Sequence, residues 1–167
     1  MTTSLTPHWP RAILHLDMDA FFVNVHILDN PEHANIPLAV GGKPESRGVV
    51  ASASYEARKL GIRSAMPMKT AVRLCQNLTI VSANWSRISE CSKSVMEILQ
   101  TYGPVEKMSV DEAYVDLSEF EMAETIADEI RKTVKEKTGL PCSVGLATSK
   151  LVAKVASDFD KPEGFTV

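Results

Sequence analysis

Short apolar runs and longer amphipathic segments follow one another along the whole chain. Runs of four to six apolar residues are typical of buried strands. The predicted strands are Ile13–Leu16, Pro37–Val40, Val49–Ala53, Val105–Val110, Ala113–Leu117 and Cys142–Ala147. Segments whose apolar residues recur every three or four positions predict helices. The predicted helices are Phe21–Leu28, Tyr55–Leu60, one that opens at Pro67, Ile88–Tyr102, Ala123–Val134 and Lys150–Phe159.

The composition is that of a globular protein with one domain or two small ones. The 167 residues are 44% hydrophobic and 23% charged, enough to bury a core without disulfides. Cys75, Cys91 and Cys142 are too few and too scattered for a disulfide framework or zinc site, and fit a reducing compartment. Met1–Arg11 lacks the apolar core of a signal peptide, and no apolar run could span a membrane. We therefore expect a cytoplasmic protein.

The charges are distributed unevenly along the chain. The total of −3 excludes a strongly basic protein. However, Gly41–Asn84 contains seven Lys or Arg and two Glu, a net +5, which leaves −8 for the rest. Asp111–Ile130 contains eight acids and no base. Either one part binds a polyanion and another binds metal ions, or both are ordinary solvated faces.

Acidic residues follow two of the predicted strands. Asp17 and Asp19 end the first strand, where buried carboxylates need a metal or cation, although surface loops produce such pairs by chance. Asp111 and Glu112 lie between two apolar runs, where neighbouring side chains point to opposite faces. Both could reach one metal only at a tight hairpin corner; a plain polar turn is the alternative. Three or four such carboxylates suit Mg²⁺.

These residues leave two chemistries open. One is two-metal phosphoryl transfer, and the other is a phosphatase with Asp17 as nucleophile. The Asp17-Met18-Asp19 run is superficially similar to haloacid-dehalogenase-type phosphatases. That family needs a small residue where Phe21 and Phe22 stand, and a doubly wound parallel sheet, against which the predicted hairpin argues.

Five ordered runs are much more specific than any single residue. They are HLDMDAFF at 15–22, SYEARKLGIRSAMP at 54–67, SVDEAYVD at 109–116, SVGLA at 143–147 and KVASDFDKPEG at 154–164. In this order they resemble the Y-family translesion DNA polymerases, and within them the DinB type. The resemblance covers nearly the whole chain from Ile13 onward.

The resemblance implies an α+β fold, with a ferredoxin-like antiparallel palm sheet, packed helices and a small inserted fingers subdomain. Residues 1–20 and 84–167 would form the palm and 21–83 the fingers. The family's thumb and little finger would be absent, so we expect a monomer that is weakly active or inactive alone. The implied activity is addition of dNTPs to a primer 3′-hydroxyl on template DNA, in translesion synthesis and DNA repair. A sliding clamp is the implied partner of the full-length protein.

The resemblance also implies the site residues. Asp17, Asp111 and Glu112 would be catalytic and hold two Mg²⁺ ions together with the backbone carbonyl of Met18, while Asp19 gives structural support. Phe22 would be the steric gate against ribonucleotides, with core packing as its alternative role.

Four further residues would bind the nucleotide triphosphate: Ser52, Tyr55, Arg58 and Lys161. Taken alone, Arg58 and Lys161 would be solvated surface charges. The remaining alternative is a non-catalytic nucleotide-binding fragment.

Overall fold

The computed structural model describes residues 9–167, which form two compact units. The sheet unit consists of the residues up to Asp19 together with Ser89–Val167, and the inserted unit is Ala20–Ile88. The expectation for Met1–Arg11 falls mostly outside the described residues. Among residues 9–167, no helix combines the length and the apolar character needed to cross a bilayer.

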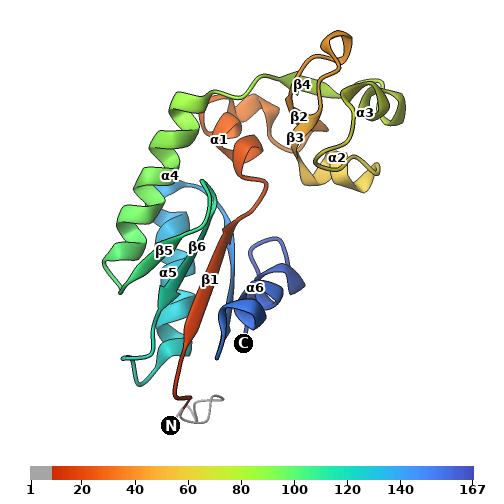
Figure 1. The fold of residues 1–167 in the computed structure, drawn as a ribbon. Helices are drawn as coiled ribbons and strands as arrows, with labels where there is room; N and C mark the ends of the chain where they lie inside the picture. The colour runs from red at the N-terminus through yellow and green to blue at the C-terminus, as the bar shows by residue number, and fades with distance from the viewer. Residues whose placement is uncertain (1–8) are drawn as a thin grey trace. The chain divides into compact units, whose positions relative to one another are not determined.

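The sheet unit is built on five strands in the order β5-β6-β1-β7-β8 (Figure 1). The strands are β1 (Ile13–Met18), β5 (Val105–Lys107), β6 (Glu112–Asp116), β7 (Cys142–Ala147) and β8 (Phe165–Thr166). All neighbouring strands are antiparallel except β7 and β8. The helices are α4 (Trp85–Gln100), which begins in the inserted unit, α5 (Ala123–Thr138) and α6 (Lys150–Phe159). The central strand β1 is thus completed by strands that come much later in the chain.

Alternation along β1 assigns each helix to a face of the sheet. Ile13 packs with Ala153 of α6, so the odd-numbered residues of β1 face α6. On the opposite face, the Cys142 thiol donates to the carbonyl of Arg131 in α5, and Lys107 bonds Ser92 in α4. The three helices therefore enclose the sheet from both sides (Figure 1).

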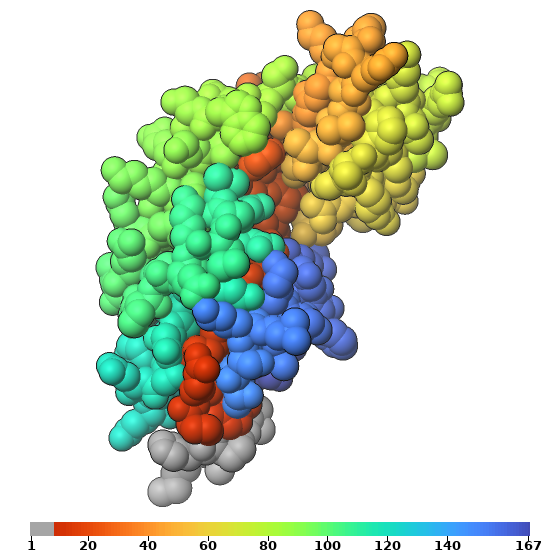
Figure 2. Space-filling view, viewed as in Figure 1, coloured from red at the N-terminus to blue at the C-terminus, as the bar shows by residue number. Residues whose placement is uncertain are grey.

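Helix α6 is buried on one side only. Ala153 and Ser157 pack against the sheet, while Leu151, Val155 and Phe159 are exposed. In the space-filling view, the C-terminal segment (blue) lies beside the first residues of β1 (red), as this packing requires (Figure 2). The amphipathic spacing of α6 thus serves to dock one narrow face on β1 and β7.

The inserted unit has a smaller, three-stranded sheet in the order β3-β2-β4. Its elements are α1 (Phe21–Asp29), η1 (Pro31–His33), β2 (Leu38–Gly41), η2 (Pro44–Ser46), β3 (Val50–Ala53), α2 (Tyr55–Lys59), α3 (Met68–Leu74) and β4 (Thr79–Val81). The Ser54 hydroxyl begins α2 by accepting from the Ala57 N–H, and it donates to the Ile36 carbonyl. This one side chain therefore fixes both the start of α2 and the approach to β2.

The α+β class predicted from the resemblance is confirmed, and every predicted strand and helix is present. Most boundaries agree within two residues, but three differ by more, among them the end of α5 at Thr138 and not Val134. Strand β5 ends at Lys107, not Val110, because the chain turns from Met108 onward, and α4 begins at Trp85, one turn before Ile88. Strand β4 is absent from the prediction.

Candidate active site

The acids at the end of β1 lie beside those that precede and begin β6. Asp17 is directly opposite Glu112 in the antiparallel register, on the face that carries α6. The Asp17 side chain is only 14% exposed. Two carboxylates side by side on neighbouring strands repel each other and create strong demand for a cation.

Asp111 occupies the corner of the β5–β6 hairpin. The Ser109 hydroxyl holds this corner, donating to Asp111 Oδ1 at 2.6 Å and accepting from the Glu112 N–H at 3.1 Å. The Met18 N–H donates to the Asp111 carbonyl at 3.0 Å, so the corner lies against the end of β1. The tight turn required for Asp111 and Glu112 to serve one site is therefore present.

Two lysines from the C-terminal segment meet these carboxylates. Lys161 Nζ lies 2.6 Å from Asp17 Oδ1, and Lys154 Nζ lies 2.8 and 2.7 Å from the two oxygens of Glu112. The Lys161 side chain is only 20% exposed. The interpretation of Lys161 as a solvated surface charge is therefore wrong.

The two paired acids differ in proton affinity. Burial raises the pKa of Asp17 to about 6, the charges of Glu112 and Asp111 add to the rise, and Lys161 opposes it. Burial also disfavours ionised Glu112, but its bonds to Lys154 and the charge of that lysine outweigh burial and lower its pKa. Of these two acids, Asp17 is therefore the one whose negative charge is less well compensated by nearby positive charge.

His15 stands behind this cluster and is fully buried, as expected for a packed strand residue. Its Nδ1 is 2.7 Å from Ser157 Oγ, and the single hydroxyl proton of Ser157 is donated to the Lys154 carbonyl at 2.8 Å. His15 Nδ1–H is therefore the donor to Ser157. Burial lowers the pKa of His15 to about 4, so the ring is neutral at pH 7. The chain of bonds fixes the backbone that carries Lys154.

The donor chemistry fits a hard divalent cation. Asp17, Asp111 and Glu112 offer oxygen ligands only, and ammonium groups already contact two of them. Within residues 9–167, no three His, Cys, Asp or Glu side chains are grouped as a formed metal site. The lysines thus hold the carboxylates in their present positions.

The predicted triphosphate residues other than Lys161 belong to the inserted unit. Ser52 is buried on β3, and Tyr55 and Arg58 lie on α2. Arg58 Nε–H donates to the Ala53 carbonyl at 2.9 Å, and the guanidinium lies 4.9 Å from the centre of the Tyr55 ring. Arg58 is therefore a positioned cation and not a freely solvated one.

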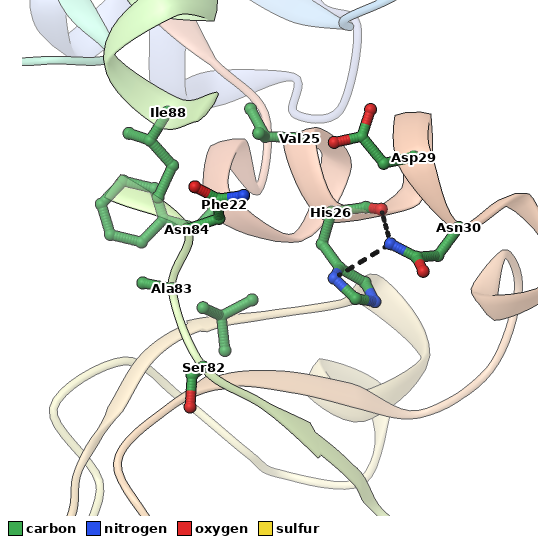
Figure 3. Close-up of a pocket in the computed structure, with 10 residues that line it drawn as sticks. Phe22, Val25, His26, Asp29, Asn30, Ser82, Ala83, Asn84 and Ile88 are labelled. Atoms are coloured by element: carbon green, nitrogen blue, oxygen red, sulfur yellow. Dashed lines mark hydrogen bonds between the residues drawn. The ribbon is translucent and has the colours of Figure 1, made fainter. Parts of the chain in front are cut away.

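Phe22 is half-buried within the inserted unit. Its ring meets Trp85 edge-on, with centroids 5.4 Å apart, and it lines a small cavity of about 60 Å³ (Figure 3). On another side of this cavity, Asn30 donates to the carbonyl of His26 at 2.9 Å (Figure 3). The packing role expected of this ring is therefore present.

Sequence reasoning missed Lys154, Ser109 and Ser157 as parts of the carboxylate cluster. Ser109 stands only two positions before Asp111, so its hydrogen bond to the Asp111 carboxylate could have been predicted from the local sequence. Lys154 and Ser157 are separated from their partners by 42 and 142 positions, and their helical spacing resembles that of any solvated turn. Both residues lie in the run KVASDFDKPEG, but nothing local in that run indicates their distant partners.

Comparisons with known proteins agree on one family. The model of the impB/mucB/samB family matches residues 16–158. The chain is 44% identical over 162 residues to DNA polymerase IV of Listeria monocytogenes and 48% identical over 162 residues to that of Staphylococcus aureus. Each alignment covers 94% of this chain and 46% of the relative, so the chain spans about half the length of these proteins.

Solved structures lead to the same family. DinB from Sulfolobus solfataricus superposes with a TM-score of 0.89 at 32% identity, over 93% of this chain and 48% of that one. An insertion ternary complex of Dbh DNA polymerase gives a TM-score of 0.88 at 32% identity, again over 93% and 48%. The expected resemblance to Y-family polymerases is thus confirmed, and the chain belongs to the impB/mucB/samB family.

Proposed function

We propose that this chain is the catalytic core of a translesion DNA polymerase, adding dNTPs to a primer 3′-hydroxyl. The observation that carries the proposal is the Asp17–Glu112 pair on adjacent strands, with Asp111 at the corner beside them. Similarity to curated DNA polymerases IV supports the reaction class, and the length shared with them supports a core that comprises palm and fingers. The sheet unit corresponds to the proposed palm and the inserted unit to the proposed fingers.

Asp17, Asp111, Glu112 and the Met18 carbonyl are the groups that would hold two Mg²⁺ ions. Bound there, Mg²⁺ supplies Lewis-acid stabilisation of phosphate charge and lowers the pKa of the primer hydroxyl. The protein keeps these acids at a buried strand end, where charge interactions are stronger than in water. The Lys154 and Lys161 ammonium groups balance the acids in the structure described above.

Arg58, Tyr55, Ser52 and Lys161 are the proposed triphosphate-binding groups. The guanidinium of Arg58 is held by a backbone carbonyl and the Tyr55 ring, so little side-chain entropy remains to be lost on binding phosphate. Primer–template DNA and, in the longer proteins of the family, a sliding clamp are the proposed macromolecular partners.

The fold argues against the phosphatase alternative. Strand β1 pairs antiparallel with both neighbours, β6 and β7, whereas that alternative needs a parallel doubly wound sheet. Asp17 at the end of β1 therefore lacks the sheet environment that the phosphatase interpretation requires.

A hybrid enzyme tests the proposed function. This chain replaces the matching part of Listeria monocytogenes DNA polymerase IV, and primer extension is measured with Mg²⁺ and dNTPs. We expect template-directed extension by the hybrid, because the parent supplies whatever lies beyond the matched part. A folded hybrid that binds dNTP but never extends a primer would instead identify a non-catalytic nucleotide-binding unit.

Phe22→Ala is expected to raise ribonucleotide incorporation by the hybrid about 10- to 100-fold relative to deoxynucleotides, the usual value of one excluded group. The reason is loss of the ring that would meet the 2′-hydroxyl. Single-nucleotide insertion with dATP and ATP measures the ratio. Trp85→Ala removes the edge-on partner of Phe22 but keeps the ring, and serves as the control for lost packing. Unchanged sugar discrimination in Phe22→Ala would refute the gate role.

A further inference from the structure

Asp19 is a buried carboxylate that the proposed chemistry does not use. It directly follows β1 and is 1% exposed. Its Oδ2 accepts from the backbone N–H of Glu163 at 2.8 Å, and both its oxygens lie within 3.1 Å of the Ser143 hydroxyl. A carboxylate this deeply buried is stable only with such donors, so its bonds are a structural requirement and not an accident of the surface.

Ser143 links Asp19 to a second residue of the same segment, Gly164. Its side chain on β7 is fully buried, donates to Asp19 and accepts from the N–H of Gly164 at 3.1 Å. The Val144 N–H adds a backbone bond to the Gly164 carbonyl at 3.0 Å. Asp19 thus holds two consecutive backbone N–H groups, one directly and one through Ser143.

Those two N–H groups belong to the tight turn between α6 and β8. Glu163 has a left-handed φ of 55°. A Cβ on Gly164 would lie 2.4 Å from the Asp160 carbonyl oxygen, so only glycine fits. A turn with this strained backbone must be stabilised by contacts with other segments, and the hydrogen bond of Asp19 to its backbone supplies one such contact.

The same turn carries Lys161. Its ammonium lies against Asp17, which is on β1 two residues before Asp19. β1 and the residue after it therefore contact the turn twice, Asp17 at the Lys161 side chain and Asp19 at the backbone of Glu163. The turn is also held by the Val144 bond to Gly164, by Arg131, which donates to the Glu163 carbonyl at 2.9 Å, and by the Lys135–Glu163 ion pair, which is about half exposed on both sides.

We propose that Asp19 is a positioning residue for Lys161, and through it for the triphosphate of the incoming nucleotide. The first half concerns the protein alone, and the second rests on the proposed function. Asn is a poor substitute because it offers one acceptor oxygen, and its amide N–H groups would face the donors on Ser143 or Glu163.

Two readouts on the 167-residue chain separate these halves. The first is the acetylation rate of Lys161, followed by mass spectrometry with the 61%-exposed Lys132 as internal standard. The second is the affinity for dATP in Mg²⁺, measured by calorimetry. Asp19→Asn is expected to raise Lys161 labelling about tenfold and to weaken dATP binding about tenfold, the effect of one lost charge-assisted bond.

Glu163→Gln is the matched control. It removes the exposed ion pair with Lys135 but keeps the backbone N–H that Asp19 binds. Both readouts are expected to stay at wild-type values. If Asp19→Asn does not fold by circular dichroism, Ser143→Ala takes its place; it removes the bond to Gly164 and is expected to change both readouts in the same direction.

The outcomes are distinct. Wild-type labelling of Lys161 in a folded Asp19 or Ser143 variant would overturn the proposal. Faster labelling with dATP binding unchanged would overturn its second half. Faster labelling in a chain whose wild type never binds dATP would support the positioning of Lys161 and count against the proposed function itself.

Discussion

Asp111→Asn is expected to lower primer extension by the hybrid enzyme about a thousandfold, or about 4 kcal/mol of transition-state stabilisation. Asn keeps the shape of Asp111 and an oxygen for the Ser109 hydroxyl, so the hairpin corner survives. What it removes is one negative charge at the meeting point of β1 and β6. Asp17→Asn is expected to have a similar effect, because it removes a carboxylate whose side chain is only 14% exposed. Single-turnover insertion of one nucleotide measures the loss.

Asp116→Asn is the control for both variants. Asp116 lies on the same face of β6 as Glu112, but at the opposite end, where its carboxylate accepts from Ser118. We expect extension within about twofold of the unsubstituted hybrid, as is usual for surface changes. If all three variants, Asp111→Asn, Asp17→Asn and Asp116→Asn, retained full primer extension, the assignment of the site to this end of the sheet would be wrong.

Gly145→Ala is expected to destabilise the sheet unit by about 3 kcal/mol, at the upper end of overpacking costs. Gly145 is opposite His15 on β7, directly beneath α6. An added Cβ would lie 2.2 Å from the Ala153 carbonyl oxygen and 2.4 Å from the Ser157 nitrogen. Both are backbone atoms that cannot rotate away, so α6 must move outward. Urea unfolding of the 167-residue chain measures the free-energy change.

Gly61→Ala shows how much of that cost is steric. Gly61 has a φ of 88°, and its Cβ would meet nothing closer than Leu74 Cδ1 at 3.9 Å. The substitution should therefore cost only the left-handed strain, about 1 kcal/mol. Equal losses at the two glycines would show that α6 does not rest on Gly145 as described.

The main elements of the fold could be predicted because their patterns are local. Ile13–Leu16 and Cys142–Ala147 are apolar enough to indicate buried strands from composition alone. Strand β4 could not be predicted, since it has three residues and its pairing depends on β2, which is distant in sequence. The first turn of α4 was missed because polar residues surround Trp85 there.

The acids of the candidate site could be predicted from the strand pattern, whereas Lys161 was predicted only through the family resemblance and Lys154 was not predicted. Asp17 and Glu112 stand at the ends of recognisable strands, and the need for a corner at Asp111 follows from strand geometry. Lys154 and Lys161 lie on a segment whose spacing resembles a solvated helix and turn. Only the pairing of β1 with β6 and β7 brings that segment to the acids, and such pairing is a property of the complete chain.

The sheet unit is built from two separate parts of the chain, and this separation affects how the protein folds during synthesis. β1 leaves the ribosome early, but Ile13 pairs with Asp116 and Ala147, more than a hundred positions later. The inserted unit is continuous in sequence and can fold before the sheet unit. Until the later strands are made, β1 is an apolar strand with both edges unpaired. Closing the sheet around β1 is therefore the slow, high-contact-order event. The acids and lysines meet only at that step, so this part of the chain gains its candidate site all at once.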